Sequence, residues 1–240
     1  KSERWARGDE NWPALARFAA DPLALVNGCA ILSQMTYVDL LSAAQSYNLT
    51  IFGSLAGDAG SIILLGPHEP GYWPVLCASP EWQDGGPDPV DRWSHRVISQ
   101  LAQETGSKPY FPFGAHPAPF LTWALASDRA WQSPVGMLVQ AEAGLLVSYR
   151  GALELDFCDF GQDPSESTCP SCAQPCTQAG SIGALNGENY NVDACWSSMR
   201  EDPEQRCLTA GCLARRACPV SAAYPRQAAH SAYHMRQFLK

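Results

Sequence analysis

The sequence has few basic residues and no long apolar run. Its 240 residues include 16 Lys and Arg against 24 Asp and Glu, a formal net charge of −8 at pH 7. Because binding to a phosphate backbone relies on clustered cations, this balance speaks against nucleic acid as a partner. No stretch approaches the roughly 18–20 apolar residues of a membrane span, and the first residues, Lys1–Trp5, lack the apolar core of a signal peptide. We therefore expect no membrane partner.

Several nucleotide-binding and hydrolase signatures are also missing. The sequence contains no glycine-rich phosphate loop, no Gly-x-Ser-x-Gly motif and no internal repeat. Hydrophobic residues make up 46% of the chain, so a packed core is expected and disulfides are not needed for stability. The ten cysteines are consequently the strongest functional signal.

The first 157 residues predict a sheet flanked by helices, and hence an α+β fold. Apolar residues at helical spacing predict helices over residues 28–49, 88–106 and 118–127, the second with Asp88 as its N-cap. Strands are predicted over 50–55, 61–65 and 144–155, the last with a kink at Gly151. The continuous apolar run at 61–65 is typical of a central strand covered on both faces.

The cysteines divide the chain into two unequal parts. Cys29 and Cys77 lie in apolar surroundings in residues 1–157, where a buried cysteine acts as a small hydrophobic residue, and the other eight fall in residues 158–240. The polar passage 159–168 predicts a connecting loop, so we place a domain boundary between 157 and 158. Cys158 lies three residues after a predicted strand end and is interpreted as a bystander.

The spacing of three cysteines resembles an iron–sulfur ligand motif. Thiolates suit iron, and bacterial ferredoxins supply them in a C-x₂-C-x₂-C-x₃-C-P run. Here Cys169, Cys172 and Cys176 follow a C-x₂-C-x₃-C pattern, and Gly180 stands where the fourth cysteine is expected. A terminal Cys-Pro pair, which ends the second ferredoxin motif, occurs at Cys218.

Matching these residues to the ferredoxin pattern predicts two unequal metal sites. The first has four thiolates for one [4Fe–4S] cluster, from Cys169, Cys172, Cys176 and Cys218. The second has only three, from Cys195, Cys207 and Cys212, because Gly180 replaces the fourth ligand. We therefore expect one intact cluster and a second that is degraded, labile or lost.

Two other interpretations of the cysteines remain open. Zinc accepts Cys169, Cys172 and two later cysteines in tetrahedral geometry. A disulfide framework, for example with a Cys207–Cys212 pair, is the alternative for an exported protein. The thiolate interpretation favours a reducing cytoplasm.

The arrangement of the whole chain resembles the superfamily of epoxyqueuosine reductase, the reductive dehalogenases and the cobalamin-trafficking chaperones. The resemblance covers roughly residues 60–220 and is carried by the cysteine block and by the predicted strand with Tyr149-Arg150-Gly151-Ala152. It implies a nitroreductase-like core that holds a corrinoid (cobalamin) over its sheet, followed by a small, partly degenerate ferredoxin-like domain. The catalytic acids of epoxyqueuosine reductase have no equivalent that we can locate, so no catalytic residue is assigned.

The resemblance also suggests residues that face a cofactor. Candidates are Ser133–Gly136 and five further residues, Tyr110, Phe111, Phe113, His116 and Tyr149, for each of which simple packing is an equally good interpretation. His230 and His234 lie one helical turn apart and could bind metal, but without a third ligand nearby we expect a solvent-exposed pair.

Three functions compete at this point. The first is a redox protein with one [4Fe–4S] cluster and a corrinoid site, a possible cobalamin-linked reductase that receives electrons from a partner protein. The second is a non-enzymatic cobalamin-binding or trafficking protein, and the third is a zinc-stabilised interaction module. Relatives of the nitroreductase type suggest a homodimer.

Overall fold

The computed structural model describes residues 35–156, 162–180, 182–185 and 190–239. In its first part the elements are α1 (Tyr37–Ser46), β1 (Leu49–Ala56), β2 (Ser61–Pro67), α2 (Tyr72–Cys77), α3 (Pro80–Gln83), α4 (Pro89–Thr105), β3 (Lys108–Tyr110), α5 (Phe120–Ala126), β4 (Ala130–Gln132), β5 (Leu138–Gln140) and β6 (Gly151–Leu155). The cysteine-rich part contains the 3₁₀ helices η2 (Cys169–Ser171) and η3 (Pro175–Thr177), then α6 (Val192–Glu201), α7 (Arg206–Ala210), α8 (Leu213–Ala217), α9 (Pro219–Ala223) and α10 (Ala228–Phe238). The fold mixes helices with small antiparallel sheets and is α+β, as predicted.

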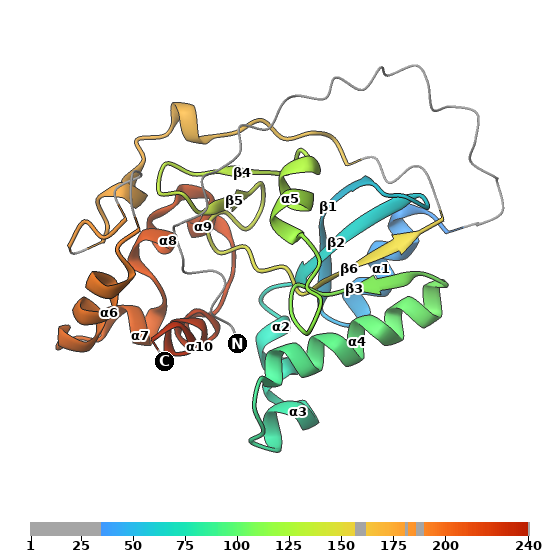
Figure 1. Cartoon of the computed structure of the whole chain (residues 1–240), viewed down its shortest axis with the longest axis horizontal. Coiled ribbons are helices and arrows are strands. Elements are labelled where there is room, and N and C mark those ends of the chain that lie inside the picture. Colours follow the sequence, from blue (N-terminus) through green and yellow to red (C-terminus); the bar gives the residue numbers. More distant parts are fainter. Residues whose placement is uncertain (1–34, 157–161, 181, 186–189, 240) are drawn as a thin grey trace.

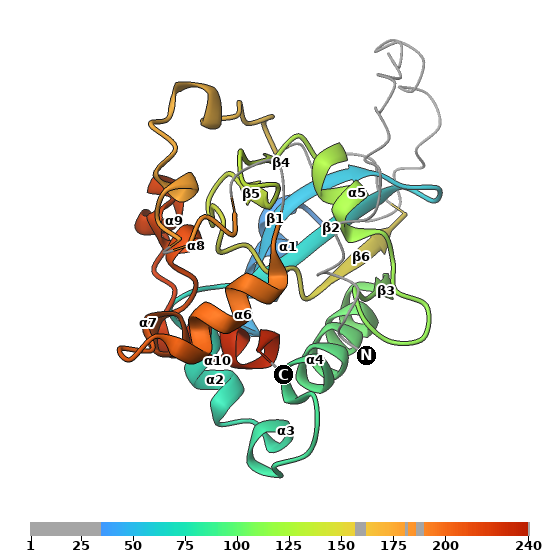
Figure 2. The same ribbon diagram turned by 60° about the vertical axis from the view of Figure 1, so that its left-hand side comes forward.

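Four antiparallel strands form the main sheet in the order β1-β2-β6-β3 (Figures 1 and 2). Every residue of β2 is buried, which confirms the prediction of a central strand covered on both faces. Alternate β2 side chains enter two different cores because successive residues of a strand point to opposite faces. Ile63 and Leu65 pack with α1, α2 and α4, whereas Ile62 and Leu64 pack with α5.

The core beside α4, which we call the sheet core, is built on large apolar side chains. α4 presents Trp93, Val97, Ile98 and Leu101 to the sheet, and the Trp93 ring meets Tyr72 of α2 edge-on at 5.2 Å. Gly151 lies where this packing is closest, because a Cβ at Gly151 would meet the Ile98 side chain at 2.6 Å. The predicted glycine kink is therefore the start of β6, placed where α4 crosses the sheet.

The predicted helix boundaries are correct only in part. α4 and α5 match their predictions closely. α1 begins at Tyr37, after a capping box formed by Thr36 and Asp39 that was not predicted from the sequence. Residues 28–34, the start of the predicted first helix, lie outside the described residues. Asp88 does precede α4, but its φ is +48° and its side chain makes no capping hydrogen bond. The helix instead begins with Pro89, which has no N–H to be capped.

The strand predicted over 144–155 is wrong in its first half. Residues 144–150 are irregular, and Gly144, with φ of +59°, closes a turn in which its N–H donates to the Gln140 carbonyl at 2.8 Å. The carbonyls of Leu145 and Leu146 accept hydrogen bonds from Arg215 at 2.8 Å and Arg226 at 2.5 Å rather than from a neighbouring strand. The side chains of two distant arginines therefore make the hydrogen bonds that a neighbouring strand would otherwise make to these carbonyls.

A third hydrophobic core, which we call the cysteine core, joins the two parts of the chain. Val135, Val139 and Leu145, from the β4–β5 hairpin and the turn after it, pack against Cys176 and Cys218. Gly144 allows a close approach here, because a Cβ would lie 2.5 Å from the Ser221 backbone nitrogen. Figures 1 and 2 show α6–α9 at one end of the molecule, the sheet at the other and the hairpin between them. The third core therefore spans the predicted boundary at 157.

None of the helices in the described residues is long and apolar enough to cross a membrane.

Candidate metal centre

Four cysteines from distant parts of the sequence line one cavity of about 460 Å³. Cys169, Cys172 and Cys176 come from the segment of η2 and η3, and Cys218 lies at the junction of α8 and α9. Apolar side chains form most of the remaining wall, including Val139, Leu145 and Val220. The four residues predicted to form the first site are thus brought together.

Short, proline-containing turns hold three of these cysteines in place. Pro170 lies within η2, and the N–H of Cys172 donates to the Cys169 carbonyl at 3.2 Å. Gln174 adopts φ of +53°, which turns the chain so that Pro175 can begin η3 and Cys176 points into the core. Three cysteines on one tight turn can present their sulfurs toward a common centre.

Two N–H groups donate to the sulfurs of this cavity, and one buried hydroxyl lines it. The indole N–H of Trp131 donates to Sγ of Cys169 at 3.2 Å, and the backbone N–H of Gln174 donates to Sγ of Cys172 at 3.3 Å. Ser133 lines the same cavity, and its Oγ is buried without a hydrogen-bond partner in the structure. Such donors stabilise negative charge on cluster sulfurs.

The thiols of the first group influence one another. Burial, and then the neighbouring Cys218, Cys169 and Cys172, raise the pKa of Cys176. The proton therefore remains on this thiol near neutral pH, and metal binding has to displace it. Loading of the site consequently releases protons and is weaker in acid.

A second group contains Cys195 of α6, Cys207 of α7 and Cys212, which precedes α8. Burial, together with Cys212 and Cys207, raises the pKa of Cys195 to about 11, and burial followed by the neighbouring Cys212 raises the pKa of Cys207. Burial, together with the neighbouring Cys195 and Cys212, also raises the pKa of Tyr190. Tyr190 was not among the residues predicted from the sequence.

The spacing of the ligating side chains bears on which kind of metal centre this cavity can hold. Across the described ranges, no group of three or more His, Cys, Asp or Glu side chains could hold a metal ion. A cubane cluster places its irons at separate corners, so its thiolates stand farther apart than those around one zinc. An apolar cavity lined by four thiols, with an unpartnered hydroxyl and N–H donors toward sulfur, suits the larger group.

All eight cysteines in the described parts of the chain are free thiols, so the proposed Cys207–Cys212 disulfide is not formed. Cys77 is half-buried at the end of α2, beside the sheet core and away from both groups, in line with a packing role. Cys29 and Cys158 lie outside the described residues.

The residues predicted to face a corrinoid make packing and polar contacts within the protein. Neither the cysteine cavity nor the second cavity described below is lined by any of them, namely Tyr110, Phe111, Phe113, His116 and Tyr149. The Tyr110 hydroxyl donates to Glu154 at 2.6 Å, Phe111 stacks on His95 at 4.8 Å, and His116 is exposed. Tyr149 is buried against Phe52 and Phe120. Ser133 and Pro134, from the other predicted segment, line the cysteine cavity instead.

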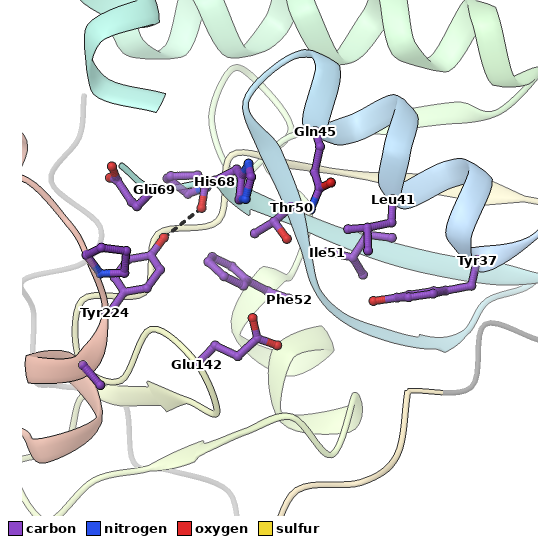
Figure 3. Close-up of a pocket in the computed structure, with 13 residues that line it drawn as sticks. Tyr37, Leu41, Gln45, Thr50, Ile51, Phe52, His68, Glu69, Glu142 and Tyr224 are labelled. Atoms are coloured by element: carbon purple, nitrogen blue, oxygen red, sulfur yellow. Dashed lines mark hydrogen bonds between the residues drawn. The ribbon is translucent and has the colours of Figure 1, made fainter. Parts of the chain in front are cut away.

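A second cavity of about 550 Å³ lies between α1, the sheet and the segment after α9. Figure 3 shows Tyr37 and Leu41 of α1 on one side and Tyr224 and Glu142 on the other, with Phe52 between them. The Tyr224 hydroxyl donates to the Pro67 carbonyl at 2.8 Å. Pro219 at the start of the five-residue helix α9 lines the first cavity, and Ala223 at its end lines the second.

The prediction that His230 and His234 form a solvent-exposed pair is wrong. His230 is 1% exposed, and its Nδ1 lies 2.6 Å from Oε1 of the buried Glu69. Nε2 atoms of the two histidines are 3.1 Å apart, and Trp73 stacks on His230 at 4.9 Å. Burial raises the pKa of Glu69 to about 7 and lowers the pKa values of both histidines.

Comparisons with known proteins leave the family of this chain open: no protein-family description, curated protein or solved structure matches it.

Proposed function

We propose that this protein is a one-electron carrier in which Cys169, Cys172, Cys176 and Cys218 bind one [4Fe–4S] cluster. A single observation carries the proposal: these four thiols, the last of them 42 residues after its nearest partner in the sequence, line one mostly apolar cavity. When bound, the cluster supplies a site that accepts and returns single electrons.

The groups around the cavity would shift the reduction potential of the cluster in opposite directions. The N–H donors of Trp131 and Gln174 favour the reduced, more negative state and raise the potential. The apolar wall of Val139, Leu145 and Val220 keeps water away and disfavours added charge, which lowers the potential. The guanidinium of Arg215 bonds to the Leu145 carbonyl at 2.8 Å and thereby fixes a cation close to this wall.

The resemblance to the epoxyqueuosine reductase superfamily also implies a nitroreductase-like fold, a bound corrinoid and a redox partner protein. These three features rest on that resemblance alone. The cavities give the corrinoid no specific support, because the five residues predicted for it line neither of them. Titration of the protein with cobalamin tests this part alone, and an unchanged visible spectrum of the cobalamin removes it without affecting the cluster.

Purification without oxygen tests the electron-carrier proposal. We expect brown protein with about four iron and four sulfide per cluster, and visible absorbance that dithionite bleaches. A Cys169→Ser variant loses this centre, whereas a Cys77→Ser variant, altered at a half-buried thiol beside the sheet core, keeps it. Colourless protein that contains zinc and no iron contradicts the proposal.

A further inference from the structure

The hydroxyl of Ser133 is unpaired at the wall of the cysteine cavity. Ser133 is 6% exposed, and its Oγ has no hydrogen-bond partner among the described residues. By contrast, the hydroxyl of Ser127, which is 7% exposed, donates to the Ala124 carbonyl at 2.7 Å and accepts from the Arg129 N–H at 3.3 Å. Since a buried hydroxyl without an acceptor destabilises a folded chain, Ser133 lacks a partner that a bound group could supply.

The β4–β5 hairpin fixes the position of this serine. Ser133 directly follows β4, its N–H donates to the Met137 carbonyl at 2.8 Å, and its carbonyl accepts from the Gly136 N–H at 3.0 Å. Both backbone groups are therefore paired, and the hydroxyl is left over. Trp131, whose indole N–H donates to Sγ of Cys169 at 3.2 Å, lies two residues earlier in the same arm of the hairpin. One arm thus carries two donor groups toward the cysteines.

A bound cluster would bring sulfur acceptors into this cavity. The indole of Trp131 and the backbone of Gln174 already donate N–H groups to two cysteine sulfurs. A [4Fe–4S] cluster adds its own sulfides to the thiolates that hold it, and these sulfurs carry negative charge. A serine hydroxyl can rotate its hydrogen toward an acceptor of this kind.

We propose that the Ser133 hydroxyl donates a hydrogen bond to a sulfur of the bound [4Fe–4S] cluster and thereby favours both its binding and its reduced state. The inference rests on the proposed function for the group that is bound. Reduction adds negative charge to the cluster sulfurs, so the hydrogen bond strengthens on reduction and raises the potential. In cluster-free protein the same hydroxyl has no acceptor and contributes no stability. A serine that only packs would not differ between the two forms in this way.

A Ser133→Ala variant of the whole chain tests both forms. After removal of the cluster with a chelator under reducing conditions, we expect its unfolding midpoint in denaturant to be at least as high as that of wild type. With the cluster bound, we expect the ratio of reduced to oxidised protein at a fixed potential to fall about fivefold, equivalent to about 40 mV for one electron. A dithionite titration followed by visible absorbance measures this ratio.

Ser127→Ala is the matched control, because it removes a paired hydroxyl of similar burial outside the cysteine cavity. We expect it to lower the unfolding midpoint in both forms and to leave the potential unchanged. An unchanged potential in Ser133→Ala, or a cluster-free midpoint that falls as in Ser127→Ala, overturns the inference, while iron in the wild type leaves the proposed function standing. If Ser133→Ala loses its iron, the cluster-free midpoint decides alone. Wild-type protein without iron removes the proposed function and this inference together.

Discussion

The sheet and the cysteine-rich part of this protein are held together by different means. Among the described residues, the sheet core contains 17 buried hydrophobic side chains, among them Trp93, Tyr72 and Leu101. The cysteine core contains seven, of which two are the proposed ligands Cys176 and Cys218. Hydrophobic burial thus supports the sheet, while under the proposed function the cysteine-rich part would depend more heavily on its bound cluster.

Helix length shows the same contrast. α4 beside the sheet has 17 residues, whereas α7, α8 and α9 have five residues each. Isolated helices below about 12–15 residues are marginal in water, so these short helices need tertiary support. In the proposed centre, a ligand bond from Cys218 would supply it for α8 and α9, because Cys218 lies at their junction.

Removal of the proposed cluster should destabilise the cysteine-rich part much more than the sheet, and this is the largest effect that we expect. We expect a chelator under reducing conditions to expose the backbone amides of residues 206–223 to hydrogen exchange, with several kcal/mol less protection. The amides of β2 and α4 should keep their protection because their core contains no proposed ligand. Mass spectrometry of exchanged peptides measures both regions together, and equal loss in both would contradict the account.

Arg226 links the two regions, and its loss has the next largest expected effect. Its Nη1 donates to the Leu146 carbonyl at 2.5 Å, and burial lowers its pKa to about 10. Arg226→Met leaves that carbonyl without its donor, so we expect the free energy of unfolding to fall by about 1–3 kcal/mol. Denaturant unfolding measures this loss, with Arg236→Met, in an exposed contact to Leu208, as the control that should lose little.

The pH dependence of stability tests the contact between Glu69, after β2, and His230 of α10. Since its folded pKa is raised to about 7, Glu69 contributes stability below its unfolded pKa of 4.5, and this is lost as the pH rises toward 7. The lowered pKa values of His230 and His234 act in the opposite direction, because unfolding in acid lets both histidines take up protons. Glu69→Gln therefore removes the loss of stability with rising pH that partly offsets the gain from the two histidines.

For Glu69→Gln we expect stability to depend more steeply on pH between about 5 and 6.5, by up to about 1.4 kcal/mol per pH unit. Denaturant unfolding at several pH values measures the slope. Glu142→Gln is the control, because this carboxylate is half-exposed and paired with Arg129 at 2.9 Å. Equal slopes in wild type and Glu69→Gln would show that the buried carboxyl does not titrate in this range.

Trp131 gives the smallest expected effect. Trp131→Phe keeps an aromatic ring but removes the N–H that donates to Cys169 at 3.2 Å. A hydrogen bond worth about 1 kcal/mol more in the reduced state corresponds to about 40 mV for one electron, so we expect the midpoint potential to fall by roughly this amount. Trp123→Phe, in the core of α5, serves as the control in the same redox titration.

Local sequence patterns predicted the elements that depend on local chemistry. The apolar run of β2 and the helical periodicity of α4 were sufficient to find both elements. The segment 144–150 was not predictable in this way, because Arg215 and Arg226, which bond its carbonyls, lie 70 and 80 residues away. The burial of His230 likewise depends on Glu69, 161 residues earlier.

The candidate site shows the same limit. The C-x₂-C-x₃-C spacing indicated three of the thiols that the structure gathers around one cavity, and the distant Cys-Pro pair at Cys218 indicated the fourth. The residues Trp131 and Ser133 carry no spacing signal, and only the folded chain brings them to this site. A ligand motif therefore specifies the sulfurs, and the tertiary structure specifies what surrounds them.

Iron and sulfide analysis of the Cys218→Ser variant tests the central claim most directly. Cys218 is the one member of the first group that lies outside the 169–176 segment, so its role depends on the fold rather than on local spacing. We predict that Cys218→Ser loses about four iron and four sulfide per chain relative to wild type and to Cys77→Ser. Unchanged iron and sulfide in Cys218→Ser would contradict the four-thiolate centre.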